Sequence, residues 1–356
     1  MSLPYLHPYL GLSNGLNTLH AAGGGAGGIG GWVELGRTTL GSNGDNIDVS
    51  SLPDKRYYMV LANTTSSGLN RHGLRYNSDT GSNYAWRYSA NGAADGTVTS
   101  NGRIIIQADN TATDEFSVTY IANKSDKEKL SYSQDVKQIA TGATTAPSRM
   151  ETVGKHAQTS NPISTITLFN SESGDYASGS ECVVLGWDPS DSHTNNFWEE
   201  LASVELGSPG DNLSSGTFSA KKYLWVQVFT KNSGTNNHAI RFNGDSGTNY
   251  AYRRNLDGGS DSTEINGSND ASISMSSLGG FNLFSNIFII NSASREKLHI
   301  SHTVFQNTAG ASNAPRRREA VGKWTNTSNQ ITSILVYNNE TGDYDTGSFI
   351  KVWGAD

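Results

Sequence analysis

The sequence predicts an all-β protein, with two tandem homologous antiparallel β-sandwich or jelly-roll-like domains preceded by an extended N-terminal arm. Two observations predict this class. The 356-residue chain repeats itself at a nearly constant offset. Its apolar residues alternate with polar ones along short segments bounded by Gly, Asn, Asp and Ser, as in half-buried strands. Each copy is domain-sized and long enough to bury its own core.

The repeat is clearest in two near-identical passages, RYNSDTGSNYAWR at 75–87 and RFNGDSGTNYAYR at 241–253, which lie 166 positions apart. Later the offset is 168, where SRMETVGK at 148–155 matches RRREAVGK at 316–323. A duplication with a two-residue insertion in the second copy explains both offsets. The predicted organisation is an N-terminal arm and Gly-rich tether (1–30), a first sandwich (31–188), a linker (189–196) and a second sandwich (197–356).

Strands are expected where aromatic or β-branched residues recur at every second position, as in YYMVLAN at 57–63 and ITSILVYN at 331–338. FWEELASVEL at 197–206 resembles a short amphipathic helix, but its repeat partner at 31–40 contains a glycine and two threonines. One conformation should serve both copies, and a strand suits both. About eight to ten strands per domain are expected, in two packed sheets. Cys182 is then a buried residue of a last strand.

Composition excludes several classes of protein. The net charge of −7 argues against a general grip on nucleic acid. A single cysteine allows no internal disulfide, and no run of 18 apolar residues suggests a membrane helix. The N-terminus does not read as a signal peptide, because no Lys or Arg precedes Arg37. We therefore expect no nucleic acid, membrane or cofactor among the partners.

The passage Asn77–Asn83 allows three interpretations: a turn, a weak Ca²⁺ site or a ligand pocket. Oxygen-bearing residues alternate as at the start of a calcium loop, but the twelfth position, which should carry a bidentate glutamate, holds Tyr88 in one copy and Arg254 in the other. Asn and Asp side chains also cap their own backbone in turns, where Gly adopts positive φ. The sequence favours a hairpin turn.

No catalytic constellation is evident. Arg149, Glu151, Val153 and Lys155 share one strand face, which predicts ion pairs with neighbouring strands. Glu151 as an acid would need a second carboxylate, and none is identifiable on an adjacent strand. His299 and His302 should point to opposite faces of their strand. We expect no catalytic residues and no metal site, and hence not an enzyme.

Two tyrosines suggest a binding function instead of a catalytic one. Tyr176 and Tyr344 follow Gly-Asp near the end of each copy, in SGDYASGS and TGDYDTGS. Exposed aromatic rings beside Asn and Asp would suit a glycan-facing surface. The alternative is a tyrosine packed over a turn, which needs no ligand.

The arm has no second copy. Leucines and tyrosines give its first 19 residues an apolar character, and Pro4 and Pro8 favour extended chain. Glycines at 23–31 then supply a flexible tether. Such an arm predicts docking on a partner, the alternative being an arm folded back on its own domain. The residues expected at this partner interface are Leu3, Tyr5, Leu6, Tyr9, Leu10, Leu12 and Leu16.

The paired motifs R-[YF]-N-x-D-[ST]-G-x-N-Y-A-x-R, P-x-R-x-E-x-V-G-K and G-D-Y-x-x-G-S resemble those of β-sandwich virion proteins of tailed bacteriophages. The resemblance covers both copies and carries no catalytic motif. It implies a non-enzymatic virion structural protein on the particle surface, made in the host cytoplasm.

This resemblance implies attachment through residues 1–30 to a major capsid protein or appendage subunit, decoration or stabilisation of the capsid, and homo-oligomers in the particle. Two alternatives are a tail or head fibre that recognises host surface glycan and, among jelly rolls in general, an enzyme that cleaves polysaccharide.

Overall fold

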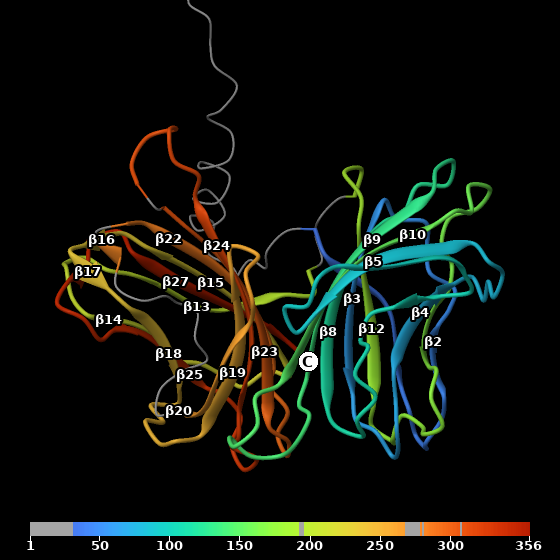
Figure 1. Cartoon of the computed structure of the whole chain (residues 1–356), viewed down its shortest axis with the longest axis horizontal. Coiled ribbons are helices and arrows are strands. Elements are labelled where there is room, and N and C mark those ends of the chain that lie inside the picture. Colours follow the sequence, from blue (N-terminus) through green and yellow to red (C-terminus); the bar gives the residue numbers. More distant parts are fainter. Residues whose placement is uncertain (1–30, 192–195, 268–277, 280, 307) are drawn as a thin grey trace, which may run out of the picture.

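The computed structural model describes residues 31–191, 196–267, 278–279, 281–306 and 308–356 (Figure 1). Every strand pairing in these residues is antiparallel, which confirms the all-β prediction. None of the described residues forms a helix with the length and apolarity needed to cross a membrane. Residues 1–30 of the arm lie outside the described part of the chain.

Residues 31–188, called domain 1, form two sheets. The larger has the strand order β1-β12-β3-β8-β9-β10-β5-β6 and the smaller has the order β2-β11-β4-β7. The strands are β1 (Val33–Thr39), β2 (Asn46–Val49), β3 (Tyr57–Thr64), β4 (His72–Tyr76), β5 (Tyr84–Ala90), β6 (Gly96–Asn101), β7 (Ile104–Ile105), β8 (Glu115–Ala122), β9 (Lys129–Lys137), β10 (Ser148–His156), β11 (Ile166–Asn170) and β12 (Glu181–Trp187).

Residues 197–356, called domain 2, repeat this topology with a sheet of order β13-β27-β15-β22-β23-β24-β19-β20 and a smaller one of order β14-β25-β18. The strands are β13 (Glu199–Glu205), β14 (Asn212–Thr217), β15 (Tyr223–Thr230), β16 (Asn232–Ser233), β17 (Thr235–Asn236), β18 (His238–Phe242), β19 (Tyr250–Leu256), β20 (Ser262–Gly267), β21 (Leu278–Gly279), β22 (Leu283–Ile290), β23 (Lys297–Phe305), β24 (Arg316–Trp324), β25 (Ser333–Asn338), β26 (Asp343–Tyr344) and β27 (Phe349–Ala355).

The equivalence of the two copies extends to irregularities. The register of β1 shifts between Glu34 and Gly36, and that of β13 shifts between Glu200 and Ala202. Segment 199–205 is a strand, as the comparison of copies predicts. Each domain has more than the expected eight to ten strands, partly because ladders as short as two residues, such as β7 and β26, have no recognisable sequence period.

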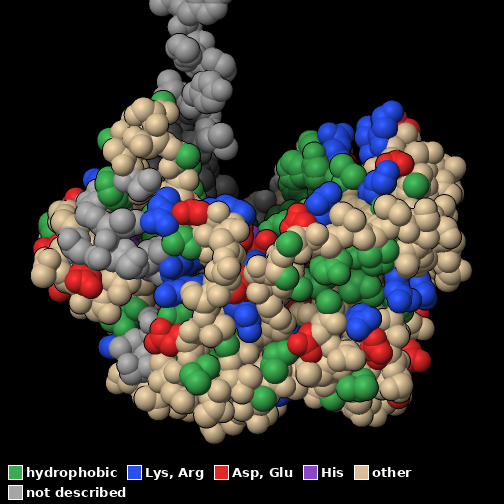
Figure 2. All heavy atoms as spheres, in the orientation of Figure 1, with side chains coloured by type: hydrophobic (Ala, Val, Ile, Leu, Met, Phe, Trp, Pro, Cys, Tyr) green, Lys and Arg blue, Asp and Glu red, His purple; other side chains and the backbone are tan. Residues whose placement is uncertain are grey.

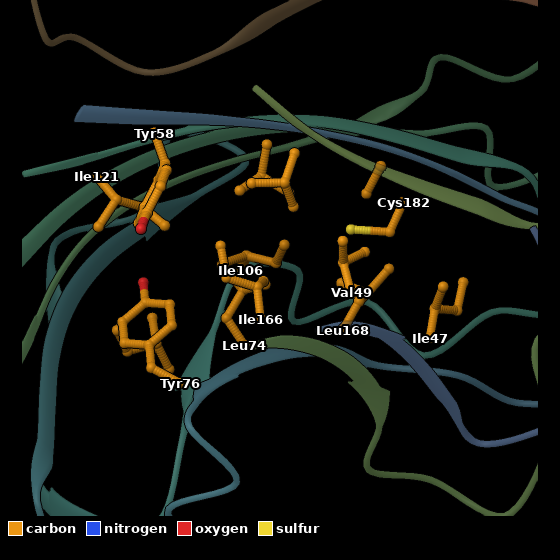
Figure 3. Packing of buried hydrophobic residues seen from close by; sticks show 14 of the residues in the cluster. Ile47, Val49, Tyr58, Leu74, Tyr76, Ile106, Ile121, Ile166, Leu168 and Cys182 are labelled. Carbon is orange, nitrogen blue, oxygen red and sulfur yellow. The ribbon is translucent and has the colours of Figure 1, made fainter. Parts of the chain in front are cut away.

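The core of domain 1 fills the space between its two sheets. Figure 3 shows Tyr58, Ile121 and Cys182 extending from the larger sheet toward Leu74 and Leu168 of the smaller one. Alternation along the strands sends these side chains to one face. Cys182 is fully buried, and burial raises the pKa of its thiol to about 12, so it packs as a small apolar residue.

A second apolar cluster joins the domains, because the outer faces of the two larger sheets pack against each other. Domain 1 contributes residues such as Phe116 and Val136, and domain 2 contributes Tyr223, Phe288 and Leu298. In Figure 1, β8 and β23 lie side by side where the two halves meet. The larger sheets are therefore buried on both sides over part of their area, and the smaller sheets lie on the outside.

Candidate functional site

The duplicated passage Asn77–Asn83 is a polar arch that joins two sheets. It links β4 of the smaller sheet to β5 of the larger one, so the predicted hairpin is wrong. Local alternation is the same for both strands and does not reveal which sheet each one enters. Asn77 has φ of 55°, and its Oδ1 accepts hydrogen bonds from the backbone N of Ser164 and Thr165 at 2.7 and 3.1 Å.

Asp79 closes the arch from within. One carboxylate oxygen accepts from Gly81 N at 2.8 Å, and the other lies 2.8 Å from both Asn83 Nδ2 and His156 Nε2. The proposed weak Ca²⁺ ligand is thus fully engaged by protein donors. These contacts support the turn interpretation over a metal site or a ligand pocket.

The second arch repeats this scheme with one substitution. Asp245 accepts from Gly247 N at 2.8 Å and from Asn249 Nδ2 at 2.9 Å. Trp324 Nε1 takes the place of the histidine and donates to Asp245 Oδ2 at 2.7 Å. The sequence repeats here because each arch needs the same capping groups.

The two tyrosines proposed as glycan-facing do not reach the surface. Tyr176 and Tyr344 are both 0% exposed, which corrects the glycan-facing interpretation in favour of packing. Tyr176 makes an edge contact with His72, and Tyr344 stacks on His238. The glycines that flank each tyrosine predict a tight turn, but they do not show whether the tyrosine ring faces solvent or the core.

A buried charged cluster occupies domain 1 between β4, β8 and β9. His72, Glu115 and Asp135 have ligand atoms within 4.8 Å of one another, a grouping of the kind that holds metal ions. Lys137 Nζ lies 3.2 Å from Glu115 Oε2 and also donates to Asn70 O at 3.0 Å. The ammonium group of Lys137 therefore places a positive charge directly beside the Glu115 carboxylate.

The pKa shifts describe how this cluster is neutralised. Burial opposes ionisation of Glu115, yet the neighbouring His72 and Lys137 lower its pKa. Burial, together with the charge of Glu115, raises the pKa of Asp135 well above its usual value. Burial also lowers the pKa of His72. Burial thus favours the protonated form of Asp135, while Lys137 and His72 stabilise the Glu115 carboxylate, so the charges of the cluster are compensated within a dry interior.

Domain 2 lacks this cluster. The positions of Glu115, Asp135 and Lys137 are taken by Leu283, Thr303 and Phe305 at the later offset. Leu283 and Phe305 form a small apolar cluster of their own. The fold thus accommodates either charged or apolar residues here, which argues that the cluster is internal packing particular to domain 1.

A polar cavity of about 470 Å³ lies between the domains and is the best candidate for ligand contact. Arg149 of β10 is buried at its wall, with Nη2 2.8 Å from Asp261 Oδ1 and Nη1 3.1 Å from Glu151 Oε1. The same Nη1 lies 3.6 Å from Glu319 Oε2 of β24. The prediction of ion pairs with neighbouring strands is confirmed in part: Lys155 Nζ lies 3.2 Å from Glu128 Oε2 beside β9, whereas Arg149 pairs across the domain interface.

Burial raises the pKa of Glu151 to about 7, with Arg149 opposing and Glu319 adding to the rise. His302 Nε2 lies 3.5 Å from Glu151 Oε1, and burial together with the charges of Arg149 and Arg317 lowers its pKa to about 4. Such a site offers guanidinium donors and carboxyl groups to a polar ligand.

The second carboxylate could not be predicted from strand neighbours, because it lies on the other domain. Glu319 is the repeat equivalent of Glu151, and the contact between domains brings the two regions together. The duplicated motif P-x-R-x-E-x-V-G-K was the available signal. His299 and His302 do point to opposite faces of β23, as predicted: His299 packs near Phe242 inside domain 2, and His302 faces Tyr132 of domain 1.

The predicted arm contacts, Leu3 to Leu16, lie outside the described residues. The sequence matches no family model and no curated protein. Among solved structures, it is similar to mouse laminin alpha1 chain domains LG4-5, with 10% identity over 91% of each chain and a TM-score of 0.19. A second likeness is to Ail, the attachment invasion locus protein of Yersinia pestis, with 6% identity over 80% of this chain and 99% of that chain and a TM-score of 0.12. Similarities this low carry no argument about function.

Proposed function

We propose that the protein is a non-enzymatic structural protein of a tailed-phage virion, held on the particle surface by residues 1–30 and decorating or stabilising the shell. The observation that carries this proposal is that the repeated motifs make contacts within the protein. Asp79, Asp245, Tyr176 and Tyr344 are all engaged in internal contacts. A chain whose duplicated polar groups hold its own architecture together suits a scaffold better than a catalyst.

The arm supplies the attachment in this proposal. Removing residues 1–30 is expected to abolish incorporation into particles while the thermal unfolding of the remaining chain stays unchanged. The full-length double variant Leu6→Asp, Leu10→Asp should behave in the same way, because charge on the arm opposes burial against a partner. Occupancy is measured by quantitative electrophoresis of purified particles, and full loading of either variant contradicts the proposal.

A second candidate is a tail or head fibre that recognises host glycan, and the polar cavity between the domains is the observation that favours it. A volume of about 470 Å³ with Arg149, Glu151 and Arg317 at its wall suits a sugar unit. Glycan-array binding that is lost in Glu151→Gln and Arg317→Gln but kept in the control Lys124→Gln would support it, because Lys124 is 61% exposed and does not line the cavity. No binding across a broad array would remove this candidate.

A further inference from the structure

The contact between the two domains is not symmetric, although the domains are homologous. Phe116 of domain 1 packs on Tyr223 of domain 2, with ring centroids 6.3 Å apart. The repeat equivalent of Phe116 in domain 2 is Phe284, and the repeat equivalent of Tyr223 in domain 1 is Tyr57. These side chains are 37% and 39% exposed, whereas Phe116 and Tyr223 are 1% and 0% exposed. The interface therefore uses different parts of the two sheets.

The aliphatic contacts show the same pattern. Val136 is 0% exposed in the interface, but its equivalent Val304 is 45% exposed. Leu298 is 1% exposed in the interface, but its equivalent Leu130 is 57% exposed. Five apolar side chains are exposed to solvent at positions whose equivalents in the other copy are buried: Tyr57, Leu130, Val153, Phe284 and Val304. In the view of Figure 2, hydrophobic side chains gather on the half of the molecule formed by domain 1.

The interface also has a polar anchor. Between β22 and β23, Arg295 and Glu296 project from domain 2 into domain 1. Arg295 Nη1 lies 3.1 Å from Asp114 Oδ1. Glu296 accepts a hydrogen bond from Gln138 Nε2 at 2.7 Å and another from Gly142 N at 2.5 Å. The Gln138–Gly142 loop of domain 1 therefore forms a receptor for this pair of charged residues.

Because the domains are homologous, the charged pair and the receptor loop each have an equivalent in the other copy. Neither equivalent contacts the other domain in the part of the chain that the structure describes. Lys127 and Glu128 of domain 1 are the equivalents of Arg295 and Glu296, and their side chains are 69% and 42% exposed. Gln306 and Gly310 of domain 2 are the equivalents of the receptor residues. They line a cavity of about 460 Å³ with mainly apolar neighbours.

The receptor loop already has the required shape. Gly142 has φ of +80° and Gly310 has φ of +87°, a left-handed conformation that glycine adopts readily. In domain 1 this geometry presents the Gly142 N–H to a glutamate. The same geometry in domain 2 leaves the corresponding group beside a hollow.

We propose that a second copy of this chain fills the hollow. Domain 2 of one chain docks onto domain 1 of the next chain. The domain 2 residues are Phe284, Val304, Gln306 and Gly310, and they meet Tyr57, Leu130 and Glu128 of domain 1. This contact repeats the interface that already joins the two domains within a chain. It is heterologous, so repetition gives a closed ring or an open filament. The inference stands on the repeat equivalence and does not depend on the proposed role in a virion.

The contact between chains should be weaker than the one within a chain. Three apolar interface residues of domain 1 have polar equivalents on the free surface of domain 2: Leu61, Val118 and Val183 correspond to Gln227, Asn286 and Lys351. Within a chain, the linker also raises the effective concentration of the two domains. Association is therefore expected to be reversible and concentration-dependent.

Sedimentation velocity of the full chain over a range of concentrations tests this proposal. The wild-type protein should show a mass that rises with concentration. Leu130→Asp and Val304→Asp should each weaken association at least about tenfold, because each places a carboxylate in an apolar contact. Leu69→Asp is the matched control, since Leu69 is 46% exposed and lies outside the apolar cluster between the domains. Thermal melts confirm that all variants fold.

A mixing experiment decides whether the contact is heterologous. Leu130→Asp keeps the docking surface of domain 2, and Val304→Asp keeps that of domain 1. Each variant alone should be monomeric, and an equimolar mixture should form dimers through the one intact pair of surfaces. A wild-type chain that stays monomeric, unchanged association in both variants, equal loss in the Leu69→Asp control, or no dimer in the mixture overturns the proposal.

Discussion

At the scale of single residues, the two copies solve one packing problem in two ways. Domain 1 buries Glu115 against Lys137, and domain 2 places Leu283 and Phe305 at the same positions. Exchange of a buried ion pair for apolar residues of similar volume is often neutral or stabilising, whereas loss of one partner leaves an unpaired buried charge. The residues of domain 2 at these positions can therefore be placed in domain 1 as a control for mutation of the ion pair.

Lys137→Ala should destabilise the protein by about 3–5 kcal/mol, since it leaves the Glu115 carboxylate buried without its ammonium partner. The triple change Glu115→Leu, Asp135→Thr, Lys137→Phe transplants the residues of domain 2 and should recover most of that loss. Urea unfolding monitored by tryptophan fluorescence measures both. A lysine variant within about 1 kcal/mol of wild type would show that the ion pair does not matter.

His299 should make domain 2 sensitive to acid. Burial lowers its pKa to about 3, and neither ring nitrogen has a hydrogen-bond partner among the described residues. Between the ordinary histidine pKa of about 6.5 and that lowered value, the unfolded chain binds a proton that the folded chain does not, so stability falls as pH falls. His299→Leu should unfold less readily at pH 5 and show a shallower pH dependence. Equal pH slopes for variant and wild type would refute this account.

At the scale of elements, turn chemistry was readable from sequence, but the connection was not. Asn, Asp and Gly in the duplicated passage correctly predicted a capped turn, because these residue types satisfy their own backbone. The alternation of apolar and polar residues in β4 and β5 predicted two strands. The same alternation occurs whether two strands belong to one sheet or to two different sheets, so it did not reveal the connection. Likewise, Tyr176 could be assigned to a turn, but its direction is fixed by packing on His72, far away in sequence.

The arch predicts a matched pair of effects. Asp79→Ala and Asp245→Ala each remove a carboxylate that accepts bonds from a backbone amide and from neighbouring side chains. Each should cost about 1–3 kcal/mol in thermal or urea unfolding, because partly buried donors lose their acceptor. Asp95→Ala is the control: its 3.5 Å pair with Arg87 is exposed and should contribute less than about 1 kcal/mol. A control effect as large as the arch effects would refute the capping role.

At the scale of the whole molecule, identical residues have different environments. Val136 and Val304 occupy equivalent positions of equivalent strands, yet one is buried between the domains and the other is exposed. No pattern in a single sequence separates them, since the difference arises from how the two domains meet. The all-β class and the tandem copies were therefore predictable, whereas the interface and its polar cavity were not.

The equivalent pair Glu296 and Glu128 tests this asymmetry directly. Glu296→Gln should loosen the two domains by about 1–3 kcal/mol, since the buried carboxylate bonded to Gln138 and Gly142 loses its charge. Hydrogen exchange of residues 138–143 should rise in that variant. Glu128→Gln changes an exposed 3.2 Å pair with Lys155 and should leave exchange and unfolding nearly unchanged. The residue type and the substitution are the same in both variants, and each glutamate immediately precedes its strand, β9 or β23. Equal responses would therefore mean that the domains do not meet through this anchor.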